Sequence, residues 1–304
     1  AAELAIALKQ VRDPFRTPLI LVPNGNLRKW LTLELTRTLG VTAGLDIRYL
    51  ETGLSARLFG EGAVPLSDNA LALLIDSVLA APHPDAALAP LMAYCTPGGQ
   101  ADPSRRWQLA RRLAGLFRDY GLYRHAMTEA WLRPPSRPDN GMTLAQASLW
   151  RSLFAADGLL ARINTERAEA GEPPLCSLIF SQPAAGEEDT AVHIFGFSSI
   201  SERHLQVIGT IAGSAPVSFY FLTPEAVENG RVTPPLLQET RDLWGKAAFG
   251  THGLLRETFP LLQPHTLTAG GKPRTLLEAV QTALSTGIVP AGQFTADGSL
   301  QLTG

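Results

Sequence analysis

The stretch PLILVPNGNLRKWLTLEL, from Pro18 to Leu35, joins an apolar run to a glycine turn and an amphipathic helix. The run from Leu19 to Val22 is continuous, which is typical of a strand buried on both faces of a parallel sheet. A helix is expected from about Leu27 to Leu39, where Gly40 ends it. The stretch therefore predicts an α/β domain.

A strand, turn and helix in this order also cradle nucleotide phosphates in P-loop proteins, whose motif is G-x-x-x-x-G-K-[ST]. If Lys29 is taken as the motif lysine, Pro23 and Arg28 fill the two glycine positions. Trp30 then replaces the hydroxyl residue that holds magnesium. The turn therefore lacks the residues of a working phosphate loop.

Three further strands are expected at Val192–Phe195, Val217–Leu222 and Leu300–Leu302. Apolar strands separated by helices predict a parallel sheet covered on both faces. After the first of these strands, Gly196 and Phe197 occupy the positions of the acidic pair that an ATPase uses to hold magnesium. We interpret the chain as an inactivated nucleotide-binding domain and expect no cofactor.

About 170 residues separate the first two expected strands, far more than an ordinary crossover connection contains. Their mostly helical periodicity predicts an inserted all-helical subdomain. We expect residues 1–53 and 166–304 to form the two parts of the α/β domain and residues 54–165 to form the insertion. Because the chain starts without Met and stops inside a strand-like pattern, we also expect a longer parent polypeptide.

The composition is that of a globular protein, with 45% hydrophobic residues and a formal net charge of −2. Any nucleic-acid surface would therefore be a local patch. Cys95 and Cys176 lie far apart, and neither the cysteines nor the histidines show metal-ligand spacing. We predict no metal site and no catalytic residue. No signal peptide or membrane-spanning run is found, which favours a cytoplasmic protein.

The densest positive charge lies between Arg105 and Arg124, a segment with six arginines and one acid, Asp119. At helical spacing an apolar stripe is expected to face the core, formed by Leu109, Leu113, Leu116 and Tyr120. Arg111 and Arg118 lie on roughly the opposite face. The arginines indicate either a solvated helix face or contact with nucleic-acid phosphates.

Aromatic residues are interleaved with these arginines, and they are Trp107, Phe117, Tyr120 and Tyr123. Such rings can stack on unpaired bases. Lys29 and Trp30 in the opening stretch allow the same two interpretations, a packed surface or a nucleic-acid contact. Trp30 by itself is more often a packing residue than a platform for a base.

Several segments together resemble the N-terminal part of the RecC family, the gamma subunits of exodeoxyribonuclease V. They include DPFRTPLILVPNGNLRKWLTLELTRTLGVTAGLDIRYL, LARRLAGLFRDYGLYRHAMTEAW, SLWRSLF, VHIFGFSSISERHLQVI and LWGKAAFGTHGLLRE. The resemblance implies a RecA-like parallel sheet of a superfamily 1 helicase that has lost its ATP site. It also implies a non-catalytic subunit that guides a single DNA strand and scans it for the recombination signal Chi. The implied partners are DNA ends, single-stranded DNA, and RecB-like and RecD-like helicase subunits.

The resemblance also implies a strand-scanning surface. The matching positions are Pro23, Gly25, Lys29, Tyr49, Ser55, Leu116, Arg118 and Arg124. Leu116 and Arg124 keep the family's residue types, whereas Pro23, Gly25, Lys29, Ser55 and Arg118 differ from the enteric pattern. Two alternatives stay open at this point. One is an inactivated helicase of the AddB or RexB type with its own nuclease, and the other is a small-molecule α/β enzyme that uses the cleft of the sheet.

Overall fold

The computed structural model describes residues 1–11, 16–42, 44–81, 85–133, 141–180, 189–221, 226–228, 231–233, 246–262, 292–294 and 300–302. Two compact units are present. The first contains residues 1–193 and 201–218, and the second contains residues 194–200 and 219–304. The predicted divisions at residues 53 and 165 stay a prediction.

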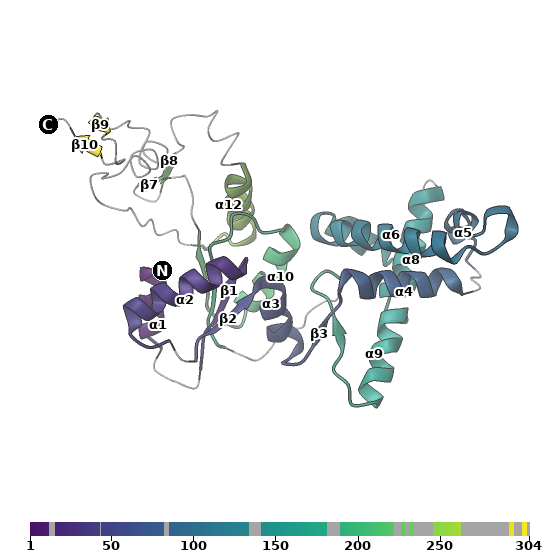
Figure 1. Ribbon diagram of the computed structural model, residues 1–304, viewed down its shortest axis with the longest axis horizontal. Helices are drawn as coiled ribbons and strands as arrows, with labels where there is room; N and C mark the ends of the chain where they lie inside the picture. Colours follow the sequence, from purple (N-terminus) through teal and green to yellow (C-terminus); the bar gives the residue numbers. More distant parts are fainter. Residues whose placement is uncertain are drawn as a thin grey trace. The chain divides into compact units, whose positions relative to one another are not determined.

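A four-stranded sheet has the strand order β2-β1-β5-β6. Figure 1 labels β1 and β2 of this sheet. Its strands are β1 (Leu19–Val22), β2 (Asp46–Tyr49), β5 (Val192–Phe195) and β6 (Val217–Tyr220). β1 and β2 pair in parallel, with Val22 opposite Tyr49. The N–H of Val192 donates to the Pro216 carbonyl and the N–H of Gly196 to that of Tyr220, so β5 and β6 also advance in the same direction. The predicted α/β class with a parallel sheet is confirmed.

The strand predictions differ from the structure in three places. β2 was not expected, because in DIRY only Ile47 is buried and the apolar signal is weak. β6 ends at Tyr220 rather than at Leu222, a residue outside the described part of the chain. β10 (Leu300–Leu302) exists but pairs antiparallel with β9 (Gly292–Phe294) in a separate two-stranded sheet, so its assignment to the parallel sheet was wrong. Three alternating residues do not specify a partner strand.

Helices of the first unit directly precede or follow these strands in the sequence. They are α1 (Ala2–Lys9), α2 (Gly25–Leu39), α3 (Leu50–Phe59) and α10 (Glu202–Ala212). α2 begins at Gly25 because the Asn24 side chain accepts a hydrogen bond from the N–H of Leu27 at 2.9 Å. It ends at Gly40, whose φ of 83° suits glycine. Gly25 is therefore the first helical residue, and the expected glycine turn consists only of Pro23 and Asn24.

The segment between the short paired strands β3 (Val64–Pro65) and β4 (Leu175–Cys176) is helical and has its own core. Its helices are α4 (Asp68–Ala80), α5 (Ala89–Cys95), α6 (Pro103–Tyr123), α7 (His125–Trp131), α8 (Gly141–Phe154) and α9 (Leu159–Glu169). The Trp150 ring lies near the middle of this core, with its centroid 5.1 Å from that of Phe117 and 4.8 Å from that of Phe154. Both contacts are edge-to-face, the geometry that aromatic pairs favour.

The buried face of α6 differs from the expected stripe. Its buried residues are Ala110, Leu113, Ala114, Phe117, Gly121 and Leu122. Of the predicted stripe only Leu113 is buried, while Leu109, Leu116 and Tyr120 pack against the core and stay partly exposed. Small residues allow neighbouring segments to approach this face closely. Phe117 is completely buried, so the prediction that it could stack on a base was wrong.

The remaining described elements are short. They are the antiparallel pair β7 (Ala226–Glu228) and β8 (Arg231–Thr233), the helix α12 (Lys246–Thr258), and the single 3-10 turns Ala86–Leu88 and Pro97–Gly99. In the second unit, the N–H of Ile200 donates to the Thr251 hydroxyl of α12 at 3.3 Å. Among the described helices, none combines the length and apolar character needed to cross a bilayer.

Candidate nucleic-acid interface

The carboxyl ends of β1 and β2 bring two of the predicted site residues together. Val22 and Tyr49 end these strands and lie opposite each other. A Cβ atom added to Gly25 would lie 3.3 Å from the Tyr49 hydroxyl oxygen, so the Tyr49 ring reaches across to the start of α2. This contact joins two residues that are separated by 24 positions along the chain.

Lys29 and Trp30 lie one turn further along α2, and both are exposed. Gly25 and Lys29 are four residues apart and therefore share one side of the helix. Trp30 exposes 46% of its surface and Tyr49 exposes 44%. We call Pro23, Gly25, Lys29, Trp30 and Tyr49 the strand-end patch. It combines a cation, two half-exposed aromatic rings and a helix N-terminus, which suits phosphate groups and unpaired bases.

Arg124 lies at the corner between α6 and α7, where it ends α6 as the C-cap residue. Its side chain is exposed, and the guanidinium carbon lies 5.8 Å from the centroid of the Tyr120 ring. This cation–π contact holds the arginine at the end of the helix. Leu116 lies two turns earlier on α6 and is partly buried against the helical core. Of these two residues, Arg124 is the one that can reach a ligand on the surface.

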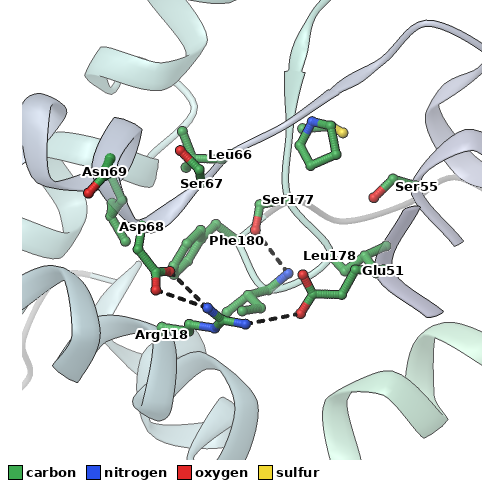
Figure 2. A pocket seen from close by; sticks show the side chains of 14 residues that line it. Glu51, Ser55, Leu66, Ser67, Asp68, Asn69, Arg118, Ser177, Leu178 and Phe180 are labelled. Atoms are coloured by element: carbon green, nitrogen blue, oxygen red, sulfur yellow. Dashed lines mark hydrogen bonds and ion pairs between the residues drawn. The ribbon is translucent and has the colours of Figure 1, made fainter. Parts of the chain in front are cut away.

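Arg118 is held by two carboxylates. Its Nη1 atom lies 3.0 Å from both carboxylate oxygens of Asp68, and its Nη2 atom lies 3.4 Å from Oε1 of Glu51 (Figure 2). The side chain keeps 40% exposure. The structure thus gives Arg118 protein partners that sequence reasoning did not foresee, although its side chain stays accessible to solvent.

Ser55 and Arg118 line one pocket of about 560 Å³. Other lining residues come from the start of α4, from the residues just before it and from the segment after β4, and include Leu66, Asn69, Ser177, Leu178 and Phe180 (Figure 2). Ser55 is only 3% exposed and lies beside Cys176, where its hydroxyl partly offsets the rise that burial causes in the pKa of the Cys176 thiol. Ser55 therefore faces the pocket rather than an open surface.

A buried polar cluster lies between α10 and the α6–α7 corner. Arg203 is 6% exposed and donates from Nε to the Leu178 carbonyl at 2.8 Å. Its Nη1 atom lies 3.2 Å from Nε2 of His125, which is also 3.4 Å from Glu129. Burial lowers the pKa of His125, and the neighbouring Arg203 charge lowers it further. His125 follows Arg124 directly, so this cluster fixes the backbone beside Arg124.

His204 and His193 are also buried. The His204 Nδ1 atom lies 2.8 Å from the Ser201 hydroxyl, and its Nε2 atom lies 4.0 Å from Glu51. Burial lowers the pKa of His204, whereas the Glu51 carboxylate raises it. Burial lowers the pKa of His193 on β5 to about 4. Both imidazoles are therefore neutral at neutral pH.

Potential metal ligands are scattered. Within the described ranges, no group of three or more His, Cys, Asp or Glu side chains could hold a metal ion. Cys95 and Cys176 are free buried thiols, and burial raises the pKa of each. The site residues described above thus offer charge, hydrogen bonds and stacking surfaces.

Comparison with known proteins gives a consistent result. A family model described as the RecC N-terminal domain matches residues 1–266. The RecBCD enzyme subunit RecC of Haemophilus influenzae is 21% identical over 237 residues, which are 70% of this chain and 21% of that protein. The same subunit of Mycobacterium tuberculosis H37Rv is 32% identical over 161 residues, 48% of this chain and 15% of that protein. That of Mycolicibacterium smegmatis is 35% identical over 149 residues, 46% and 13% of the two chains. The chain thus spans about a fifth or less of the length of these relatives.

Proposed function

Because this chain belongs to the RecC family through its N-terminal domain, we propose that it forms part of a DNA-binding subunit of a RecBCD-type helicase–nuclease. In this proposal it guides a single DNA strand and hydrolyses no ATP. Its partners would be DNA ends and RecB-like and RecD-like helicase subunits, in the repair of double-strand breaks. The family match favours RecC over the AddB or RexB type.

The strand-end patch is the observation that carries this proposal. Ligands of open parallel sheets bind in the crevice outside the carboxyl ends of the strands, where Gly25 and Tyr49 of this patch lie. Lys29 makes no ion pair with any residue in the described ranges, so its charge is available to a phosphate. Trp30 and Tyr49 offer half-exposed rings on which bases can stack.

The connection between β1 and α2 supports the loss of ATP binding. A phosphate loop wraps its ligand with consecutive backbone N–H groups from a long glycine-rich turn. Here only Pro23 and Asn24 separate β1 from α2, and proline has no N–H. The Asn24 side chain also takes the N–H of Leu27 as its hydrogen-bond donor. We therefore interpret the fold as an inactivated superfamily 1 helicase domain, in which titration with ATP should give no binding.

Salt-dependent binding of single-stranded DNA tests the proposal. Fluorescence anisotropy of a labelled oligonucleotide is measured with the full chain at several salt concentrations. Lys29→Ala and Arg124→Ala should each weaken binding about threefold to tenfold, and each should reduce the salt slope by about 0.7 because one phosphate contact is lost. Lys9→Ala, which removes an exposed lysine from the end of α1, serves as the matched control and should change little.

Equal effects of Lys29→Ala and Lys9→Ala would contradict the assignment of the patch to DNA, as would tight binding of ATP.

Scanning for Chi is part of the proposed role of the whole subunit. Because Gly25 and Lys29 depart from the enteric pattern, we expect this chain to bind strands with and without the enteric Chi sequence equally well.

A further inference from the structure

The carboxylates around Arg118 neutralise its charge. Asp68 and Glu51 approach the guanidinium from α4 and α3, and the three side chains together carry a net charge of −1 (Figure 2). All three are partly exposed, at 40% for Arg118, 49% for Glu51 and 57% for Asp68. Ion pairs with this exposure are weak, because water screens the charges and both side chains lose freedom. Another anion can therefore compete for Arg118.

Both carboxylates keep favourable surroundings if Arg118 moves away. Asp68 lies in the first turn of α4 and Glu51 in the first turn of α3, where the helix dipole stabilises negative charge. Glu51 also lies 4.0 Å from Nε2 of His204, a buried nitrogen without a hydrogen-bond partner in the described part of the chain. The helix N-termini would thus still stabilise both carboxylates after Arg118 is released.

Glu51 also links Arg118 to the strand-end patch. It lies two residues after Tyr49, at the point where β2 passes into α3. The predicted scanning surface has one segment at the strand ends and another on α6. The ion pair between Glu51 and Arg118 connects these two segments.

We propose that Glu51 and Asp68 form an acidic clamp that competes with DNA phosphate for Arg118. The proposal rests on the DNA-binding function proposed above. A phosphate that reaches Arg118 must compete with both carboxylates, so the clamp keeps binding weak at this position and lets a strand move past it. Arg118 becomes a DNA contact only when the clamp opens.

Neutral isosteres of the two acids test the clamp. Glu51→Gln, Asp68→Asn and the double variant are measured for affinity to a labelled single-stranded oligonucleotide in the full chain. Each single variant should bind about twofold to fivefold more tightly. The double variant should also show a salt slope steeper by about 0.7, because one further phosphate contact forms. Asp119→Asn removes an exposed acid next to Arg118 that belongs to neither pair, and it should change the affinity little.

The decisive comparison repeats the double variant in an Arg118→Ala background. If the clamp acts through Arg118, the gain in affinity disappears there. The clamp would be overturned if the gain in DNA affinity persisted without Arg118, or if the double variant showed no gain at all. Either result would overturn the clamp alone, because weaker binding by Lys29→Ala and Arg124→Ala would still support the DNA site. If no variant binds DNA, both proposals fail. If only the double variant binds, and only with Arg118 present, the clamp is supported.

Discussion

The tight contact between α6 and the segment after β4 leads to a prediction about two glycines on one helix. A Cβ atom added to Gly121 would lie 1.7 Å from Cγ2 of Ile179 and 3.3 Å from its Cβ. Normal carbon contacts are about 3.5–4.0 Å, so the Ile179 segment must move by about 2 Å. A Cβ atom added to Gly115 meets nothing within 4 Å. The same substitution should therefore have opposite effects at these two positions.

Glycine in a helix interior costs about 0.5–1 kcal/mol relative to alanine. Gly115→Ala should thus stabilise the protein by about that amount. Gly121→Ala has the same gain in helix propensity, but overpacking a core contact costs about 1–3 kcal/mol. We expect a net destabilisation of about 1–2 kcal/mol. Because Ile179 lines the pocket beside Arg118, this variant should also disturb the pocket.

Urea unfolding followed by far-ultraviolet circular dichroism measures both free energies, since most of the described residues around α6 are helical. A Gly121→Ala protein as stable as the Gly115→Ala protein would refute the packing of α6 against Ile179.

Three further predictions concern the folded state. Burial lowers the pKa of His193 to about 4, whereas the pKa of a histidine in the unfolded chain is about 6.5. Between these two pH values the unfolded state binds more protons than the folded state. The free energy of unfolding should therefore fall by up to about 3 kcal/mol as the pH drops from about 6.5 to about 4. His193→Gln should flatten this pH dependence in urea unfolding between pH 7 and pH 4, and an unchanged slope would contradict the assignment. Asn24→Ala should cost about 1 kcal/mol because α2 loses its cap, whereas Asn24→Asp should keep most of the stability. Phe117→Ala should cost about 3–5 kcal/mol in the same assay, since the ring is fully buried against Trp150.

Local signals account for the parts of the fold that could be predicted. β1 is a continuous apolar run and β5 is apolar except for His193, and all residues of both strands are buried. Gly40 ends α2 where the sequence indicates, because its positive φ suits a residue without a side chain. β2 was missed because it lies at the edge of the sheet and buries only Ile47. On α6, small residues rotate the buried face away from the leucine stripe, an effect that depends on which segment packs against them.

The site depends more strongly on contacts between distant residues. The family resemblance selects Gly25 and Tyr49, and the structure brings them together. Whether they bind DNA stays a prediction. The partners of Arg118 lie 50 and 67 positions away in the sequence, and no spacing rule identifies such pairs. The burial of Ser55 beside Cys176 could not be predicted either, because it follows from how α3 packs and not from the local sequence.

Hydrogen–deuterium exchange at the start of α2 reports whether a DNA strand occupies the strand-end patch. The amides of Gly25 and Asn26 lie in the first helical turn, where N–H groups have no partner within the helix and exchange quickly. A strand seated on the strand-end patch should slow their exchange, whereas ATP should not, and the amide of Glu202 at the start of α10 should stay unchanged with either ligand. Unchanged exchange at Gly25 and Asn26 in the presence of saturating single-stranded DNA, or protection there by ATP, would contradict the assignment of the strand-end patch to DNA.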